Sequence, residues 1–168
     1  MVGNTEDYLK RLIVVMGISG AGKSTAGQAI ARRLEMPFID ADDFHPRENV
    51  LKMSRGQALT DEDRWPWLAS IVQYVLESHR ENWVLACSAL KQSYRDYLAQ
   101  RLEVETVYLE LTKEEAEHRL QNRANHFMPS TLVQSQLDTL EVPTTGLTVD
   151  ATLPIERILE RTADYFMK

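Results

Sequence analysis

Cysteine is almost absent from this sequence, with Cys87 the single one among 168 residues. One thiol cannot form a disulfide within the chain, and chains without disulfides are typical of a reducing compartment, so we expect a cytoplasmic protein. Long apolar runs are missing too, since none approaches the ~20 residues that a membrane-spanning helix needs. Glu6 and Asp7 precede only a very short apolar run, which is not the pattern of a signal peptide. We therefore expect no membrane association.

Positive charge is scarce as well. The chain carries 19 Lys and Arg residues against 25 Asp and Glu residues, which gives a formal net charge of −6. Nucleic-acid-binding proteins usually present a basic surface, so we expect no nucleic-acid partner. The field of the whole molecule also repels anions, so a local cluster of Arg and Lys has to hold any anionic substrate. Because the hydrophobic content of 43% and the charged content of 26% are ordinary, we expect residues 1–168 to form a single globular domain.

Glycine is sparse, with 7 residues in all, yet a glycine-rich turn stands near the N-terminus. The turn fits the phosphate-loop pattern G-x-x-x-x-G-K-[ST] and comprises Gly17, Ile18, Ser19, Gly20, Ala21, Gly22, Lys23 and Ser24, with Thr25 following. The glycines let successive backbone N–H groups face an anion, the lysine reaches the β- and γ-phosphates, and the serine hydroxyl can ligate Mg²⁺. An apolar run before the turn and helix-forming residues after it supply the expected context. The pattern predicts a nucleoside triphosphate site, rather than a glycine-rich turn that binds nothing.

Short apolar runs alternate with amphipathic segments along the chain. This alternation predicts an α/β fold with right-handed crossovers and a parallel sheet that is covered by helices on both faces. The predicted strands are residues 11–16, 38–39, 83–87, 104–111 and 147–149, and the predicted helices are residues 23–35, 66–79, 91–101, 112–122, 130–140 and 154–166. A further short helix, followed by a loop, is expected within residues 45–56. Pro66 stands close after a helix start at residues 60–63, so we expect a short first turn that is separate from the main helix.

Acidic residues are missing from the end of the third predicted strand, where many phosphate-loop proteins have a Mg²⁺-associated carboxylate. They occur instead at the end of the second strand, as Asp40 and Asp42, followed by Asp43. Ligands of open α/β folds bind at the carboxyl ends of the strands, and alternate residues of an extended stretch point the same way. One of the pair Asp40 and Asp42 can therefore hold Mg²⁺ through water, and the other can orient or deprotonate an acceptor hydroxyl. The alternative is that Asp42 and Asp43 only cap the next helix, a role that we expect for Asp43.

Basic residues gather in the segment that follows, residues 43–80, and again after the third predicted strand. Clusters of Arg and Lys bind carboxylates or phosphates, so this segment is a candidate acceptor site. An ordinary solvated surface is the alternative for each residue, and His45 is equally compatible with a turn before Pro46. The candidate substrate-binding residues are Asp42, His45, Lys52, Arg55, Lys91 and Arg95.

An irregular segment at residues 119–131 interrupts the helical pattern. Arg119 and Arg123 stand four positions apart, so a helix places both guanidinium groups on one face. Such a segment fits a lid that closes over the nucleotide, and either arginine would neutralise phosphate charge or stack on adenine. A solvent-facing helix end is the alternative.

Several motifs together resemble the small gluconate kinases of the phosphate-loop type. The resemblance rests on residues 16–25, on Asp40-Ala41-Asp42-Asp43-Phe44-His45-Pro46-Arg47-Glu48-Asn49, on Leu59-Thr60-Asp61-Glu62-Asp63-Arg64-Trp65-Pro66-Trp67-Leu68, on Ala86-Cys87-Ser88-Ala89-Leu90-Lys91 and on Gln134-Ser135-Gln136. These motifs span most of the chain. The His-Pro, Pro-Trp-Leu and Cys-Ser-Ala-Leu-Lys groups are more specific than the phosphate loop alone.

The resemblance implies transfer of the γ-phosphoryl group of ATP to the 6-hydroxyl of D-gluconate, which gives 6-phospho-D-gluconate for carbohydrate catabolism. It also implies the fold of shikimate and adenylate kinases, a three-layer sandwich with a five-stranded parallel sheet of order 2-3-1-4-5 and a lid. Asp42 is then the expected base, and Asp150 borders adenine. Members of this family are often homodimers. Within the lid, Asn125 stands where relatives have glycine.

The resulting hypothesis is a Mg·ATP-dependent gluconokinase. Its site residues are the catalytic Lys23, Asp42 and Arg123, the nucleotide-binding residues 17–25 with Arg119, Arg123 and Asp150, and the Mg²⁺ ligands Ser24 and Asp40. Two rivals remain open, a kinase for another hydroxy acid such as shikimate and a nucleotide-dependent switch without metabolic chemistry. The acid pair and the basic acceptor segment argue against the switch, which needs neither.

Overall fold

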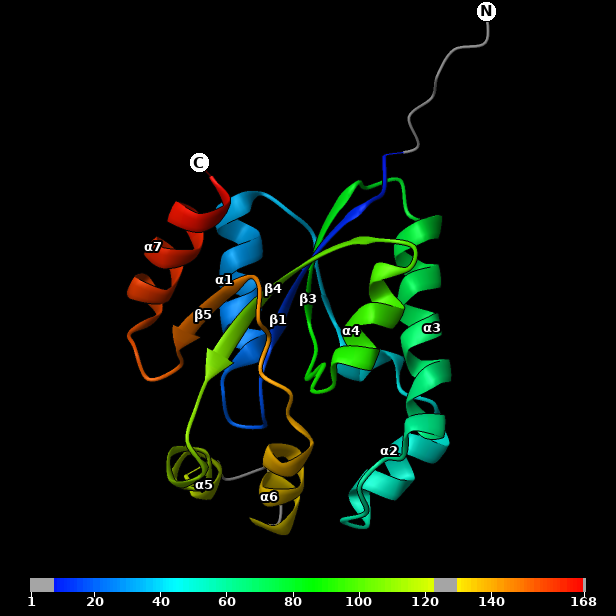
Figure 1. The fold of residues 1–168 in the computed structure, drawn as a ribbon, viewed down its shortest axis with the longest axis vertical. Helices are drawn as coiled ribbons and strands as arrows, with labels where there is room; N and C mark the ends of the chain where they lie inside the picture. Colours follow the sequence, from blue (N-terminus) through cyan, green and yellow to red (C-terminus); the bar gives the residue numbers. More distant parts are fainter. Residues whose placement is uncertain (1–7, 123–129, 168) are drawn as a thin grey trace, which may run out of the picture.

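A five-stranded parallel sheet forms the centre of the molecule (Figure 1). The structure is a computed structural model, and it describes residues 8–122 and 130–167. The strands are β1 Arg11–Met16, β2 Phe38–Asp40, β3 Asn82–Ala86, β4 Glu103–Glu110 and β5 Leu147–Asp150. They pair in parallel in the order β2-β3-β1-β4-β5. The expected α/β fold and its strand order are confirmed.

Helices cover both faces of the sheet and also extend beyond its carboxyl edge. Helices α1 Lys23–Leu34 and α7 Ile155–Phe166 pack on one face, and α3 Asp61–Glu77 and α4 Gln92–Ala99 pack on the other. Helices α2 Arg47–Ser54, α5 Lys113–Gln121 and α6 Ser130–Thr139 lie past the carboxyl ends of the strands, in the lower part of Figure 1. Among the described residues, no helix combines the length and the apolar character that crossing a membrane requires.

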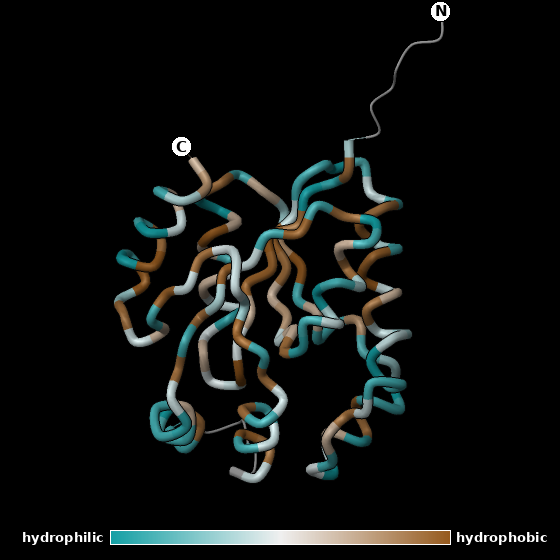
Figure 2. The backbone as a smooth tube through the Cα atoms, in the orientation of Figure 1, coloured by the Kyte–Doolittle hydropathy of each residue, from teal (hydrophilic) through white to brown (hydrophobic). Residues whose placement is uncertain are grey.

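Strand β1 belongs to both hydrophobic cores, because successive side chains of a strand point to opposite faces. Leu12 and Val14 face the α3 and α4 side, whereas Ile13 and Val15 face the α1 and α7 side. All four are completely buried. Burial on both faces explains the unbroken apolar run in the sequence. Figure 2 shows the brown colour of hydrophobic residues along the central strands.

Helix α3 overturns the expectation of a separate first turn, since it runs from Asp61 to Glu77 with Pro66 inside it. The hydroxyl of Thr60 accepts a hydrogen bond from the Asp63 N–H at 3.2 Å, and the Asp63 carboxylate accepts one from the Thr60 N–H at 2.8 Å. This capping box stabilises the first turn. The helix can therefore tolerate the loss of one backbone hydrogen bond at Pro66, which has no N–H to donate. The other predicted boundaries lie within two residues of the observed ones, and several coincide with them.

Candidate active site

The phosphate loop leaves β1 and enters α1 with the backbone geometry of an anion-binding turn. Gly20 has a φ of 90°, in the left-handed region that favours glycine. Gly17 approaches β4 so closely that a Cβ there would lie 2.8 Å from the carbonyl oxygen of Leu109. Helix α1 begins at Lys23, so its free N–H groups and the positive end of its dipole face the loop. The loop therefore offers converging donors to a phosphate group.

Ser24 and Asp40 meet beside this loop. Ser24 lies in the first turn of α1, Asp40 ends β2, and the Ser24 hydroxyl donates a hydrogen bond to Asp40 Oδ2 at 2.5 Å. Mg²⁺ prefers such oxygen ligands, and it usually keeps waters and substrate phosphates for its remaining positions. No group of three or more His, Cys, Asp or Glu side chains able to hold a metal occurs in the described part of the chain. The pair thus fits a Mg²⁺ ion whose coordination is completed by phosphates and water.

Asp40 also organises the backbone that follows β2. Its Oδ1 accepts a hydrogen bond from the Asp42 N–H at 3.0 Å and so caps the 3₁₀ helix η1, Ala41–Phe44. The side chain of Asp42 is 86% exposed, on the same edge of the sheet as the phosphate loop. The capping role expected for Asp43 is wrong, since Asp40 caps η1 and α2 begins after Pro46 without a side-chain cap. An aspartate reaches the N–H two residues ahead of itself, which favours Asp40 for this task.

Cys87 follows β3 and is buried next to these acids. Burial raises the pKa of its thiol to about 12, although the positive charge of Lys23 opposes the shift. The thiol therefore stays protonated at neutral pH, and it is not a nucleophile for a covalent mechanism.

The imidazole of His45 is nearly enclosed between η1 and α3. Its side chain is 4% exposed and stacks on Trp67, with 4.1 Å between ring centroids and 15° between planes. Its Nδ1 lies 3.3 Å from Asn49 Nδ2, and its Nε2 lies 3.8 Å from Asp42 Oδ1. Burial, helped by the positive charge of Arg64, lowers the pKa of His45 to about 4. The imidazole is therefore neutral at neutral pH.

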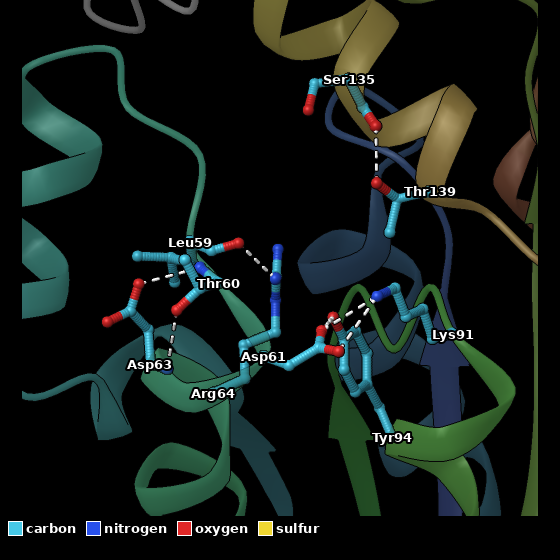
Figure 3. Close-up of polar contacts among 9 residues, drawn as sticks. All are labelled: Leu59, Thr60, Asp61, Asp63, Arg64, Lys91, Tyr94, Ser135 and Thr139. Atoms are coloured by element: carbon cyan, nitrogen blue, oxygen red, sulfur yellow. Dashed lines mark hydrogen bonds and ion pairs between the residues drawn. The ribbon is translucent and has the colours of Figure 1, made fainter.

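Two of the predicted acceptor-binding residues, Lys52 and Lys91, are held by carboxylates at the start of α3. Lys52 Nζ lies 2.7 Å from Asp63 Oδ2, and Lys91 Nζ lies 3.0 Å from Asp61 Oδ1. The hydroxyl of Tyr94 donates to the same Asp61 oxygen at 2.5 Å, and Figure 3 shows Lys91 and Tyr94 converging on this carboxylate. The acidic start of α3 therefore orients both lysines.

These contacts change the protonation behaviour of the groups involved. The hydrogen bond from Lys52, followed by that from the Thr60 N–H, lowers the pKa of Asp63 to about 2. Hydrogen bonds from Tyr94 and then Lys91 lower the pKa of Asp61. Burial and the contact with Asp61 raise the pKa of Tyr94. At neutral pH the two carboxylates are thus ionised, and the tyrosine keeps its proton as a donor.

Arg55 and Arg95, also predicted to bind substrate, are placed differently from the lysines. Arg55 is exposed at the end of α2. Arg95 is 3% exposed, and its guanidinium donates to the carbonyl of Ala89 at 2.6 Å and to that of Glu141 at 2.8 Å. Because these donors are directed at backbone carbonyls inside the fold, the placement favours a structural role for Arg95 over the predicted substrate-binding role.

Arg119 joins two segments that the sequence predicted to border the nucleotide. Its guanidinium donates to the carbonyl of Gly20 at 2.9 Å and to the carbonyl of Ala151 at 2.7 Å. Asp150, the residue before Ala151, ends β5, and its carboxylate accepts hydrogen bonds from the N–H and the hydroxyl of Thr152. Helix α5, which carries Arg119, and the end of β5 therefore both lie against the phosphate loop. The predictions for residues 123–129 of the lid, Arg123 and Asn125 included, lie outside the described residues.

One contact at the phosphate loop was not predicted from the sequence. Gln136 of α6 accepts a hydrogen bond from the Ser19 N–H at 2.7 Å and donates one to the Ser19 hydroxyl at 3.0 Å. The only signal available beforehand was the presence of Gln136 in one of the motifs, and no spacing rule gives that glutamine a partner. The contact attaches the helix that follows the predicted lid to the phosphate loop.

The parallel sheet, the phosphate loop and the adjoining Ser24 and Asp40 define the class of a phosphate-loop kinase. The family model described as an AAA domain matches residues 12–143 of the chain.

Similar proteins of known name identify the family within the phosphate-loop kinases. The chain is 48% identical to the gluconokinase of Gluconobacter oxydans (strain 621H) over 136 residues, which cover 79% of this chain and 76% of that protein. It is 35% identical to the thermoresistant gluconokinase of Escherichia coli (strain K12) over 172 residues, 98% of each chain. The crystal structure of a gluconokinase from Sinorhizobium meliloti 1021 matches with a TM-score of 0.83 at 44% identity, covering 92% of this chain and 90% of that one. The chain belongs to the gluconokinase family, so the resemblance found in the sequence is confirmed.

Proposed function

We propose that this protein transfers the γ-phosphoryl group of ATP to the 6-hydroxyl of D-gluconate, giving 6-phospho-D-gluconate and ADP. The observation that carries the proposal is the contact between Ser24 and Asp40 beside the phosphate loop, with Asp42 on the turn that Asp40 caps. A pair of hard oxygen ligands and an exposed carboxylate next to a phosphate loop suit phosphoryl transfer to a hydroxyl group. The relatives named gluconokinases support gluconate as the acceptor.

The donor side of the reaction depends on the phosphate loop and its two neighbours. Residues 17–25, through those N–H groups that are not bonded within the protein as the Ser19 N–H is, and the ammonium of Lys23 hold the phosphates and offset their negative charge. Ser24 and Asp40 would hold Mg²⁺, which when bound neutralises charge on the β- and γ-phosphates. Arg119 donates to the carbonyl of Gly20 and so supports the loop.

The acceptor side depends on Asp42 and on the cations held by α3. As O6 of gluconate bonds to the γ-phosphorus, its proton passes to the Asp42 carboxylate. The bond between that phosphorus and the bridging oxygen breaks, and ADP leaves with the electron pair. Lys52 and Lys91, oriented by Asp63 and Asp61, and the exposed Arg55 offer N–H donors to the sugar-acid carboxylate. The homodimer that the family resemblance implies and the cytoplasmic location expected from the cysteine content remain part of this proposal.

The acceptor is tested by a coupled ADP-release assay with Mg·ATP and D-gluconate, 6-deoxygluconate or shikimate. We expect turnover with gluconate and none with 6-deoxygluconate, because the latter has no O6 to attack phosphorus. For shikimate we expect a kcat/KM at least about 100-fold lower, because its hydroxyl and carboxylate are differently spaced.

A reaction with ATP and no acceptor is the control for the rival switch function. Acceptor-independent hydrolysis as fast as turnover with gluconate would favour the switch. Faster turnover of shikimate than of gluconate would show that gluconate is not the preferred acceptor, and the protein would still be a kinase.

A further inference from the structure

The surroundings of His45 suggest a role that differs from substrate binding. Trp67 of α3 donates from its indole nitrogen to the carbonyl of Ala41 at 2.7 Å, which attaches the indole to η1. The same indole stacks on the His45 ring at 4.1 Å between centroids. Trp67 is itself buried, so its ring is a fixed platform. The imidazole thus lies in one plane and cannot turn freely toward solvent.

The hydrogen bonds of Asn49 determine which nitrogen of His45 carries the proton. Asn49 is 3% exposed, and its Nδ2 donates to the backbone carbonyl of Asp63 at 2.9 Å. A carbonyl oxygen can only accept, so this contact fixes the orientation of the amide. The same Nδ2 lies 3.3 Å from His45 Nδ1 and has its second hydrogen available for it. Nδ1 is therefore the acceptor, and a neutral imidazole carries its proton on Nε2.

The protonated nitrogen faces Asp42. Nε2 of His45 lies 3.8 Å from Asp42 Oδ1, slightly beyond hydrogen-bond distance. The Asp42 side chain is exposed, so rotation about its side-chain bonds can shorten this separation. The Asp42 backbone cannot follow, since its N–H is bonded to Asp40 Oδ1 at 3.0 Å. A hydrogen bond from Nε2 would therefore favour one orientation of the carboxylate.

We propose that His45 is a positioning residue, whose neutral Nε2–H orients the Asp42 carboxylate toward the acceptor hydroxyl while Asn49 and Trp67 hold the imidazole. This inference rests on the proposed function, because it takes Asp42 as the group that receives the proton. Burial and the nearby charge of Arg64 support it, since they keep the imidazole neutral at neutral pH. A neutral N–H donor orients a carboxylate without placing a full positive charge beside it.

Two substitutions separate the N–H donor from the aromatic ring. His45→Phe keeps a ring to stack on Trp67 and loses the donor, whereas His45→Gln retains an N–H near the position of Nε2. We expect His45→Phe to lower kcat about 10-fold or more, with KM for gluconate changed less than about twofold, and His45→Gln to recover most of the rate. A raised KM at unchanged kcat would overturn the proposal in favour of direct substrate binding, and an unchanged kcat would overturn it outright.

A double-mutant cycle with Asp42→Asn tests whether His45 acts through Asp42. We expect His45→Phe to have no further effect on kcat in the Asp42→Asn background. If His45→Phe lowers kcat equally in both backgrounds, the positioning role of His45 is overturned, and the role of Asp42 as the base is unaffected. If Asp42→Asn alone leaves kcat unchanged, the proposed base has failed, which is a different result.

The protonation state is measured in the unmodified protein, so that a poorly folding variant leaves the proposal testable. Nitrogen NMR of the ¹⁵N-histidine-labelled chain distinguishes the protonated from the unprotonated ring nitrogen, and His45→Gln assigns the signal. We expect the Nε2–H form for His45 at neutral pH. A proton on Nδ1, or on both nitrogens, would overturn the proposal.

Discussion

Asp42 and Asp40 are two residues apart, but their surroundings suit them to different tasks. Both oxygens of Asp40 accept hydrogen bonds within the protein, from the Ser24 hydroxyl and from the Asp42 N–H. The side chain of Asp42 is 86% exposed and faces the edge where an acceptor would enter. A carboxylate that is held in place suits a metal, whereas an accessible one suits a substrate proton.

Asp42→Asn should lower kcat with gluconate by about 100-fold or more, because the amide cannot take the proton of O6. KM for ATP should change little, since the phosphate loop is intact. Steady-state kinetics with both substrates measure this effect. Asp43→Asn is the matched control, because this exposed neighbour caps neither helix and should keep its rate. A rate for Asp42→Asn within about threefold of the unmodified protein would exclude Asp42 as the base.

At the level of elements, α6 is attached to the phosphate loop although it lies far from it in the sequence. Gln136 makes two hydrogen bonds to Ser19, and the Glu141 N–H donates to the carbonyl of Leu90 at 2.8 Å. Arg95 of α4 reaches the Glu141 carbonyl from the other side. The position of α6 is thus tied both to the donor site and to the loop after β3, which carries Lys91 toward the acceptor site.

Gln136→Leu should lower kcat/KM for ATP about 30-fold, since it removes two hydrogen bonds that hold the loop, each worth roughly 1 kcal/mol. Gln134→Leu is the control, because Gln134 lies on the same helix and bonds only to the exposed Asp138 in the described contacts. Initial rates at varied ATP compare the two variants. An increase in kcat/KM for Gln136→Leu would mean that the nucleotide must displace this contact, the opposite of a supporting role.

For the whole molecule, the parallel sheet is what brings the site together. All five strands run in one direction, so their carboxyl ends share one edge, to which α1, β2, the β3–α4 loop and β5 each bring site residues. Residues on both faces of β1 are completely buried, so this edge is supported by two cores. Ligands that bind this folded edge and not the unfolded chain stabilise the whole molecule.

Mg·ATP should therefore raise the melting temperature. At a concentration near 100 times its Kd, a ligand of the native state adds about 2.7 kcal/mol, which for a chain of this size amounts to roughly 5–10 °C. Adding a chelator with ATP should remove much of this increase, and in Ser24→Ala the chelator should make little difference, because one of the two proposed metal ligands is lost. Differential scanning fluorimetry provides the comparison. An equal shift with and without the chelator in the unmodified protein would contradict the roles of Ser24 and Asp40.

Much of the architecture could be read from local patterns. Five apolar runs between helical segments are enough for a parallel sheet, and the phosphate-loop pattern needs only adjacent residues to state its chemistry. Asp40 and Asp42 were identifiable because both follow the same strand. The helix start at residues 60–63 was predictable, and the error at α3 lay in expecting Pro66 to separate that start from the main helix, whereas the capping box of Thr60 and Asp63 holds one continuous helix.

The sequence by itself determined the strand-and-helix order, the phosphate loop and the acid pair, because each depends on neighbours in the chain or on a fixed period. Only the tertiary structure decided which partner each remaining side chain has. Ser19 and Gln136 are 117 positions apart, Arg95 and Glu141 are 46 apart, and Lys91 and Asp61 are 30 apart. No local spacing in the sequence predicts such pairs, because they form only when the helices and loops that connect different strands pack against the same sheet. The chain supplies the chemical groups, and packing decides which of them lie buried as supports and which face the substrate.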